Sequence, residues 1–159
     1  MKIFSKIIFA ASLMATAMAT PATAQDAAVE LKGDVKAVKT MTDDSGNTST
    51  ELVAPEVIVP GDRLMFITSY RNTSAEPAEN FVVTNPLPSA VRLAPDADAG
   101  LTVSVDGGAT WGKLSALTVT GEDGAARAAD HADVTHIRWT LASVAPGAAG
   151  DLQYPAIIR

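Results

Sequence analysis

The stretch PGDRLMFITSYRN, residues 60–72, decides the fold class of this chain. Pro60, Gly61 and Asp62 are turn-forming residues, and glycine readily supplies the positive φ that tight turns require. Beyond the turn, the side chains at 64, 66, 68 and 70 fall on one face of an extended chain, and Met65 and Ile67 fall on the other. This period of two predicts a β-strand over 63–71 that is covered on both sides.

Short runs with the same alternation recur along the chain and are separated by Gly, Pro, Asn and Asp. They predict strands over residues 29–38, 52–59, 63–71, 80–84, 91–93, 101–105, 117–120, 134–141 and 151–158. No run after residue 24 keeps the 3.6-residue period of an amphipathic helix. The longest polar segment, 121–133, is expected to be a loop with room for one helical turn. About seven to nine short strands predict an all-β fold, an immunoglobulin-like antiparallel sandwich.

Residues 1–24 have the pattern of a helical, cleavable secretory signal peptide. Lys2 and Lys6 form a basic start, and the uncharged apolar run 7–19 is shorter than the ~20 residues that span a bilayer. An A-x-A site ends at Ala24, so we expect cleavage between Ala24 and Gln25 and a single domain over 25–159. The expected location is extracytoplasmic, periplasmic or secreted, in a bacterium. The mature chain is expected to have no stable membrane anchor.

Composition excludes several classes of function. Of twelve Lys and Arg residues, the predicted signal peptide contains two, which leaves ten against eighteen Asp and Glu, a net charge of −8. So acidic a chain is not expected to bind nucleic acid through phosphate contacts. Cysteine is absent, which excludes thiol catalysis, zinc–thiolate sites and disulfides. Core packing and sheet hydrogen bonds must therefore stabilise the fold.

Five pieces of sequence carry a resemblance to a known family. They are Val59–Asp62, with its PGD turn; Arg71–Thr73, which ends a strand with Asn-Thr; Asn80–Pro88, a strand that ends in Leu-Pro; Ile137–Leu141, with Trp-Thr-Leu; and Ala145–Gly147, with Pro-Gly. In this order they resemble the DUF11 family of OmcB-like repeats, over residues 55–158. The chain departs from the family in three respects. Asn85 stands where the family usually has Asp, the aromatic Tyr70 lies only two residues before Asn72, and the chain has one module.

The resemblance implies an immunoglobulin-like sandwich in an envelope or surface protein, and the family has no shared catalytic residues to transfer. The family motifs and the hairpin described next are expected to supply structural turns and anchors. These residues are Gly61, Asn72, Pro86, Pro88, Asp106, Gly107, Gly108, Trp111, Trp139, Pro146 and Gly147.

Residues Ser104–Trp111 fit the Asp-box pattern S-x-D-x-G-x-T-W, which resembles the repeated hairpin of sialidase propellers. Asp106 can accept N–H groups of the turn, and the two glycines after it permit a tight turn. A propeller needs at least four blades of ~40 residues, which this chain cannot supply. A structural hairpin is therefore favoured over a glycan-related role.

Two weaker patterns concern metal ions, and the motifs of common catalytic sites are absent from the sequence. His131 and His136 have acidic neighbours, but two histidines without a third ligand make a poor zinc site. The acidic turn 43–51 superficially resembles a calcium loop, yet it lacks glycine at the sixth position and glutamate at the twelfth. A solvated turn is favoured over loop calcium, and no cofactor is expected. No nucleophile elbow or phosphate-binding loop occurs, so no enzymatic activity is expected.

Three hypotheses about function remain open. The first is a non-catalytic envelope module that binds envelope or surface proteins, or itself, through sheet edges and loops. For this hypothesis residues 29–38 are the best candidate for a donor or edge strand. The second is a carbohydrate-binding or glycan-associated protein that stacks sugars on Trp111 or Trp139. The third is a periplasmic chaperone that uses the same edges, which the sequence does not separate from the first.

Overall fold

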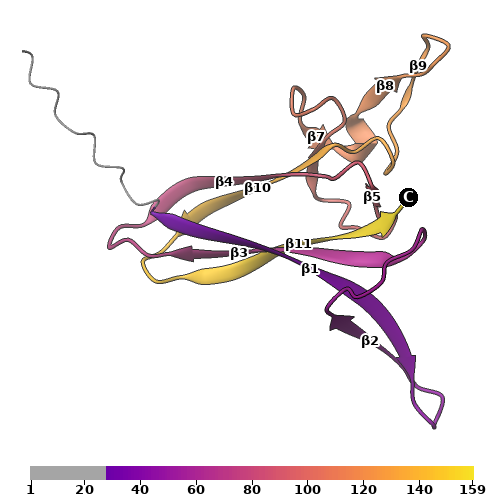
Figure 1. Cartoon of the computed structure of the whole chain (residues 1–159). Helices are drawn as coiled ribbons and strands as arrows, with labels where there is room; N and C mark the ends of the chain where they lie inside the picture. The colour runs from indigo at the N-terminus through magenta and orange to yellow at the C-terminus, as the bar shows by residue number, and fades with distance from the viewer. Residues whose placement is uncertain (1–27) are drawn as a thin grey trace, which may run out of the picture.

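The computed structural model describes residues 28–159, which form eleven β-strands and one short 3-10 helix (Figure 1). In chain order they are β1 (Val29–Thr42), β2 (Thr48–Val53), β3 (Arg63–Asn72), β4 (Ala78–Pro86), β5 (Val91–Leu93), β6 (Thr102–Ser104), β7 (Gly112–Lys113), η1 (Leu114–Ala116), β8 (Thr118–Thr120), β9 (Ala126–Ala128), β10 (His136–Val144) and β11 (Ala149–Ile158). The predicted signal peptide and its cleavage site at Ala24 and Gln25 lie outside the described residues.

Two antiparallel sheets contain most of the strands. One sheet has the order β2-β1-β3-β11-β5 and the other the order β4-β10-β6-β7, while β8 and β9 form a separate ribbon. The prediction of an all-β antiparallel sandwich is confirmed. The described strands outnumber the predicted seven to nine because β7 and β9, with two and three residues, have no counterpart among the predicted runs, whereas the run 117–120 corresponds to β8. The helical turn lies at η1, and residues 121–133 contain β9 instead.

The strand order of this sandwich differs from that of an immunoglobulin constant domain. The last strand, β11, lies between β3 and β5 and so belongs to the same sheet as β1. In an immunoglobulin constant domain, by contrast, the first and last strands lie in opposite sheets. The position of β11 places its side chains in the centre of the core, between strands that come much earlier in the chain.

An aromatic cluster joins the two sheets. Tyr154 of β11 is 1% exposed, and its ring stacks on that of Phe66 in β3 with the centroids 5.0 Å apart. Trp139 of β10, in the opposite sheet, approaches Tyr154 with the ring centroids 6.1 Å apart. Ile137 of β10 and Val103 of β6 extend this core and are almost fully buried. Three of the few aromatic residues of this chain therefore pack together between the two sheets.

A buried asparagine closes one end of the sandwich. Asn72, at the end of β3, is 0% exposed, and its side-chain amide donates to the carbonyls of Glu76 and Val144, both at 2.8 Å. Its side-chain oxygen accepts from the backbone N–H and the hydroxyl of Ser74. Its backbone carbonyl accepts from Gly147. The predicted turn residues around Asn72 and around Pro146–Gly147, far apart in sequence, therefore meet at this end.

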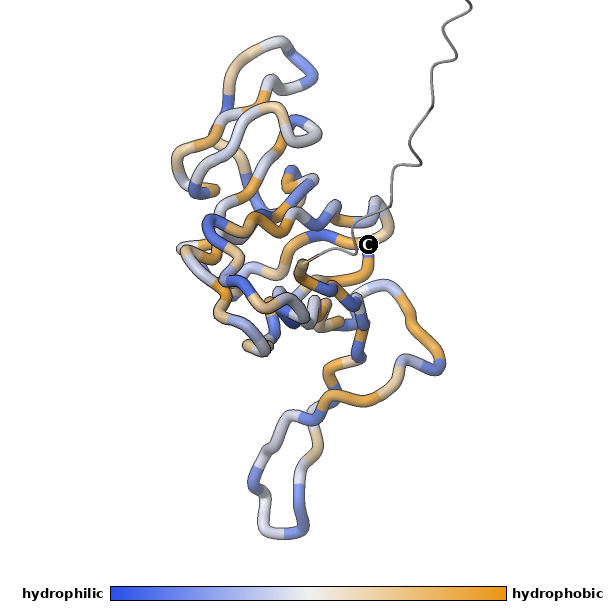
Figure 2. The backbone as a smooth tube through the Cα atoms, turned by 90° about the vertical axis from the view of Figure 1, so that its left-hand side faces the viewer, coloured by the Kyte–Doolittle hydropathy of each residue, from blue (hydrophilic) through white to orange (hydrophobic). Residues whose placement is uncertain are grey.

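The second half of β1 and all of β2 form a hairpin that projects from the sandwich (Figure 1). The predicted strand over 52–59 is wrong beyond Val53, because residues 54–62 form the connection from β2 to β3. Pro55 and Pro60 in this connection cannot donate to a ladder, which explains why an apolar run is not a strand here. Figure 2 shows the connection as a hydrophobic loop beside the more polar hairpin.

Candidate interaction site

Part of one edge of β1 has no partner strand among residues 28–159. Residues 29–37 of β1 pair with β3, and residues 37–42 pair with β2 on the other side. The Thr73 N–H donates to the carbonyl of Ala28, so even-numbered residues face β3, because backbone groups alternate in direction along a strand. The odd-numbered residues face the opposite edge, which β2 covers only from Ala37 onward. The residues that direct backbone groups to this edge without a partner strand are Val29, Leu31, Gly33 and Val35.

The side chain of Asp34 forms a hydrogen bond with the backbone at this open edge. The backbone N–H of Val35 donates to Oδ1 of the neighbouring Asp34 at 2.8 Å, in place of a bond to a strand. Lys36 Nζ lies 3.1 Å from Oδ2 of the same carboxylate. The bond from Lys36, with that from Val35, holds the pKa of Asp34 below its ordinary value. The carboxylate thus accepts a hydrogen bond from an N–H that would otherwise donate to a carbonyl of a neighbouring strand.

A groove of about 650 Å³ lies beside this edge. Leu31, Gly33 and Val35 of β1 line it together with Phe66 of β3, and Pro86 of β4 lines it from the other sheet. These β1 residues are on the inner face, opposite β3 residues that point into the core. Leu31 is nevertheless 50% exposed, which shows that the β4–β10 sheet does not cover this part of β1. We call this feature the β1 groove.

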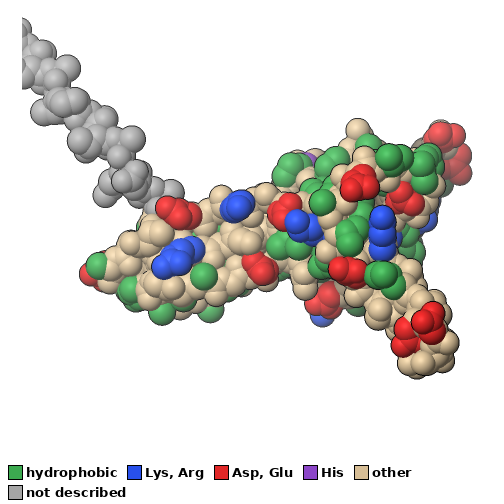
Figure 3. Space-filling model, turned by 60° about the horizontal axis from the view of Figure 1, so that its bottom comes forward, with side chains coloured by type: hydrophobic (Ala, Val, Ile, Leu, Met, Phe, Trp, Pro, Cys, Tyr) green, Lys and Arg blue, Asp and Glu red, His purple; other side chains and the backbone are tan. Residues whose placement is uncertain are grey.

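Two further apolar features are exposed. Val57, Ile58 and Val59, in the connection after β2, are 83%, 48% and 51% exposed. Val82 of β4 is 49% exposed, and β4 pairs only with β10 within the described chain. Charged side chains of both signs are scattered over the face shown in Figure 3, and acidic ones gather at the tip of the projecting hairpin. The face shown therefore favours binding through apolar contacts rather than through charge of a single sign.

The Asp-box residues form a compact hairpin whose polar groups bond to one another. Ser104 is 0% exposed; its hydroxyl donates to Asp106 Oδ1 at 2.7 Å and accepts from the Gly108 N–H at 2.9 Å. Asp106 also accepts from the Thr110 N–H at 2.8 Å. That bond, with the one from Ser104, lowers the pKa of Asp106 to about 2. Gly108 and the glycine before it have positive φ, as the turn requires.

Both tryptophans make contacts within the fold. The Trp111 indole N–H donates to the Gly108 carbonyl at 2.8 Å, and the Arg138 guanidinium carbon lies 3.6 Å from the centroid of the Trp111 ring. Trp139 contacts Tyr154 in the core. One face of Trp111 is thus occupied by a cation, and Trp139 is engaged by an aromatic neighbour.

We expect Asp106 to stabilise the folded state only while it is ionised. Its pKa falls from 3.8 to about 2 on folding, so the unfolded chain binds the proton more readily. The contribution is therefore present above about pH 4 and lost as the pH falls toward 2. Urea unfolding of the wild type and of Asp106→Asn, from about pH 5 to about pH 2, should show their stability difference shrinking with falling pH. A constant difference would contradict the role given to this carboxylate.

The histidines and the acidic turn are not brought together as a metal site. Among residues 28–159, no three His, Cys, Asp or Glu side chains lie close enough to hold one metal ion. His136 Nδ1 contacts the Thr135 hydroxyl at 3.1 Å. Asp43 accepts from the backbone of Ser45 and from both the backbone and the side-chain amide of Asn47. Its carboxylate therefore closes its own turn.

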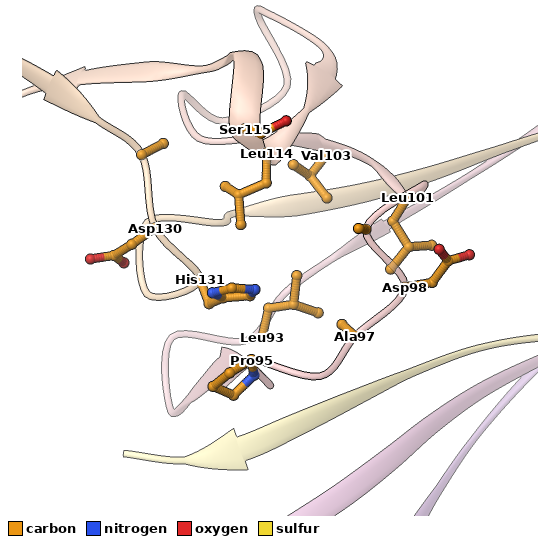
Figure 4. A pocket seen from close by; sticks show the side chains of 12 residues that line it. Leu93, Pro95, Ala97, Asp98, Leu101, Val103, Leu114, Ser115, Asp130 and His131 are labelled. Carbon is orange, nitrogen blue, oxygen red and sulfur yellow. The ribbon is translucent and has the colours of Figure 1, made fainter.

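A second cavity, of about 390 Å³, lies between β5, β6 and η1 (Figure 4). Its lining is mostly apolar, and the ring of His131 points into it beside Leu93, while Asp130 points away. Asp98 bonds within its own loop, to the Gly100 N–H at 2.8 Å. No bond joins the side chains of Asp98, Ser115 and His131 in the described part of the chain, so they do not form a relay for proton transfer. No pattern in the sequence predicted this cavity, because its lining comes from three separate stretches, 93–103, 114–115 and 129–131.

The remaining predicted turn residues lie at strand ends. Gly61 has a positive φ and donates its N–H to the carbonyl of Ile158. The carbonyl of Pro88 accepts from Val91, and Pro86 pairs with His136 at the end of β4. Each of these positions connects the turn before or after a strand to a neighbouring element.

Comparisons with known proteins do not assign this chain to a family. No family model, no curated protein and no solved structure matches it. The resemblance to the DUF11 family therefore stays a prediction. None of the helices within residues 28–159 has the length and apolar character needed to cross a membrane.

Proposed function

We propose that this chain is an exported, non-catalytic module of the bacterial cell envelope that binds other proteins, or copies of itself, through a sheet edge and loops. The observation that carries the proposal is the open edge of β1 beside the β1 groove. Unpaired backbone groups can accept a strand from another chain, and an adjacent apolar groove can hold its side chains. Pro55 lines the same groove, so the exposed connection that contains Val57–Val59 begins beside it.

Export is supported by the N-terminal sequence, with its basic start, short apolar run and A-x-A site at Ala24. Because the chain has no cysteine, its fold does not depend on an oxidising or a reducing compartment. N-terminal sequencing of the chain recovered from the periplasm or medium tests export. A start far from Gln25 would remove this part of the proposal.

The carbohydrate-binding alternative depends on the Asp-box hairpin and the tryptophans. It has less support, because Arg138 covers one face of Trp111 and Trp139 contacts Tyr154. A glycan array separates the two functions: sugar binding that is lost in Trp111→Ala would favour the alternative.

Site-specific photo-crosslinking in living cells tests the proposed function. A photoreactive residue at Leu31 reports on the open edge and one at Val57 on the exposed connection. Gln153, exposed on β11 in the middle of the same sheet, is the matched control. We expect protein crosslinks from the first two positions and few from the control. Equal yields at all three positions, or none at any, would contradict an interaction surface at the β1 edge.

A further inference from the structure

We infer that the open edge of β1 binds the same edge of a second copy, with the two strands antiparallel and centred on Gly33. The inference rests on the proposed function, since it names one partner for the edge described there. Four independent properties of residues 29–36 point to this partner and this register: charge order, hydrogen-bond direction, apolar pairing and the length of the open edge.

The charges on the outer face of β1 are self-complementary. Glu30, Lys32, Asp34 and Lys36 alternate in sign along one face of the strand. When two such strands run antiparallel about Gly33, Glu30 stands opposite the second copy's Lys36, and Lys32 opposite its Asp34. Opposite charges at directly facing positions stabilise a pair of strands, whereas like charges destabilise it. All four facing pairs in this register are of opposite sign.

The backbone groups agree with the same register. The odd-numbered residues of β1 direct their N–H and C=O groups to the open edge. About a centre at Gly33, odd residues meet odd residues, so Gly33 meets Gly33 and Leu31 meets Val35 of the second copy. These are the positions that exchange both hydrogen bonds in an antiparallel ladder, and the Val35 N–H would exchange its bond to Asp34 for one to the second copy. A register shifted by one residue would set the odd residues of one copy against the even residues of the other and leave the edge unpaired.

The inner face gains apolar contacts in this register. Leu31, which is 50% exposed, would meet Val35 of the second copy, and by symmetry Val35 would meet Leu31 of the second copy. Gly33 has a free inner side: a Cβ built there would meet nothing within 4 Å. No contact within the described chain therefore requires glycine at this position. A glycine inside a strand commonly marks the close approach of another backbone.

The length of the open edge fits a pair of identical strands. β2 takes over the edge at Ala37, where Val53 is paired. In the proposed pair, residues 30–36 of one copy lie opposite residues 36–30 of the other. The paired segment therefore ends at Lys36, one residue before the part of the edge that β2 covers. Such a contact is smaller than a standard interface of about 1,600 Å², and we expect a weak dimer. Salt should weaken it further, because the facing charges are exposed.

Disulfide formation tests the register, because the chain has no cysteine of its own. In the proposed pair the two Cα atoms of residue 33 lie about 5.5 Å apart, within the range of a disulfide. The two copies of residue 31 are separated by about four residues of strand, roughly 14 Å. Gly33→Cys should therefore form a covalent dimer under mild oxidation, whereas Leu31→Cys should not. A mixture of Leu31→Cys and Val35→Cys should form the mixed dimer.

Charge reversal tests the same contact without a covalent bond. Lys32→Glu should weaken dimerisation about tenfold or more, because it places two like-charged pairs in the contact. The double variant Lys32→Glu, Asp34→Lys restores opposite signs and the original net charge, and it should restore the dimer. Lys113→Glu, an exposed change of equal charge on β7, is the control. Sedimentation at protein concentrations up to about 0.5 mM, at low and high salt, measures the dimer.

The outcomes separate this inference from the proposed function. A dimer that is lost in the single reversal and regained in the double variant supports it. A monomer at all concentrations, or equal disulfide yields at positions 31 and 33, overturns it. Crosslinks from Leu31 to a different protein in cells would still support the proposed function in that case. Circular dichroism of each variant shows whether loss of the dimer reflects unfolding instead.

Discussion

Replacing Tyr154 with alanine should lower the free energy of unfolding by about 4 kcal/mol, because it empties the aromatic contact between the two sheets. The Tyr154 ring is 1% exposed, stacks on Phe66 and contacts Trp139. Equilibrium unfolding in urea, followed by tryptophan fluorescence, measures the loss. A change below about 1 kcal/mol would contradict the central place of this ring in the core.

Tyr154→Phe is the matched control. It keeps the ring and its stack on Phe66, so it should cost less than about 1 kcal/mol. Burial raises the pKa of Tyr154 to about 12, so the folded state holds the phenolic proton more tightly than the unfolded chain. Stability should therefore fall as the pH rises from about 10 toward 12, and the phenylalanine variant should lack this part of the loss.

Asn72→Ala should cost about 3 kcal/mol, the second largest effect that we expect from a single substitution. The change leaves the carbonyl of Val144 without its side-chain donor and removes the acceptor for the Ser74 backbone N–H. A buried polar group that loses its partner costs more than the bond itself contributes. The same urea titration measures the effect.

Two variants show which of the Asn72 bonds matter. Asn72→Asp keeps an acceptor for Ser74 but faces two carbonyl oxygens without a donor, so it should be at least as destabilising as alanine near neutral pH. Ser74→Ala leaves the amide bonds to Glu76 and Val144 intact and should cost about 1 kcal/mol. If Ser74→Ala were as severe as Asn72→Ala, the bonds to the carbonyls would not be the main contribution.

Alternation in the sequence predicted most of the strands but missed residues 48–51 of β2, a polar run with no apolar face. The run 63–71 corresponds to β3, which extends to Asn72, and the run 151–158 corresponds to β11. The same rule failed at 54–59, where apolar residues suggested a strand but Pro55 and Pro60 prevent pairing. Hydrophobicity alone does not distinguish a buried strand from an exposed apolar loop.

The candidate site depended on information that no single segment contains. Residues 29–38 were expected to form an edge, and this holds for 29–36 but not for the last two residues, which β2 covers. Which residues direct their backbone groups to the open side follows only from the pairing of β1 with β3. The β1 groove likewise depends on where the β4–β10 sheet ends. Local sequence sets the period of a strand, whereas tertiary pairing decides which side of it stays free.

The place of β11 has a consequence for the timing of folding. This strand fills the gap between β3 and β5, yet the ribosome makes it after every other strand in the two sheets. Until about residue 158 has emerged, the sheet lacks the strand that joins β3 to β5, and the Tyr154 ring is missing from the core. Contacts between segments so distant in sequence form slowly, since the chain must first close long loops. We expect such a nascent chain to stay unfolded during translation, as the proposed export across a membrane would require.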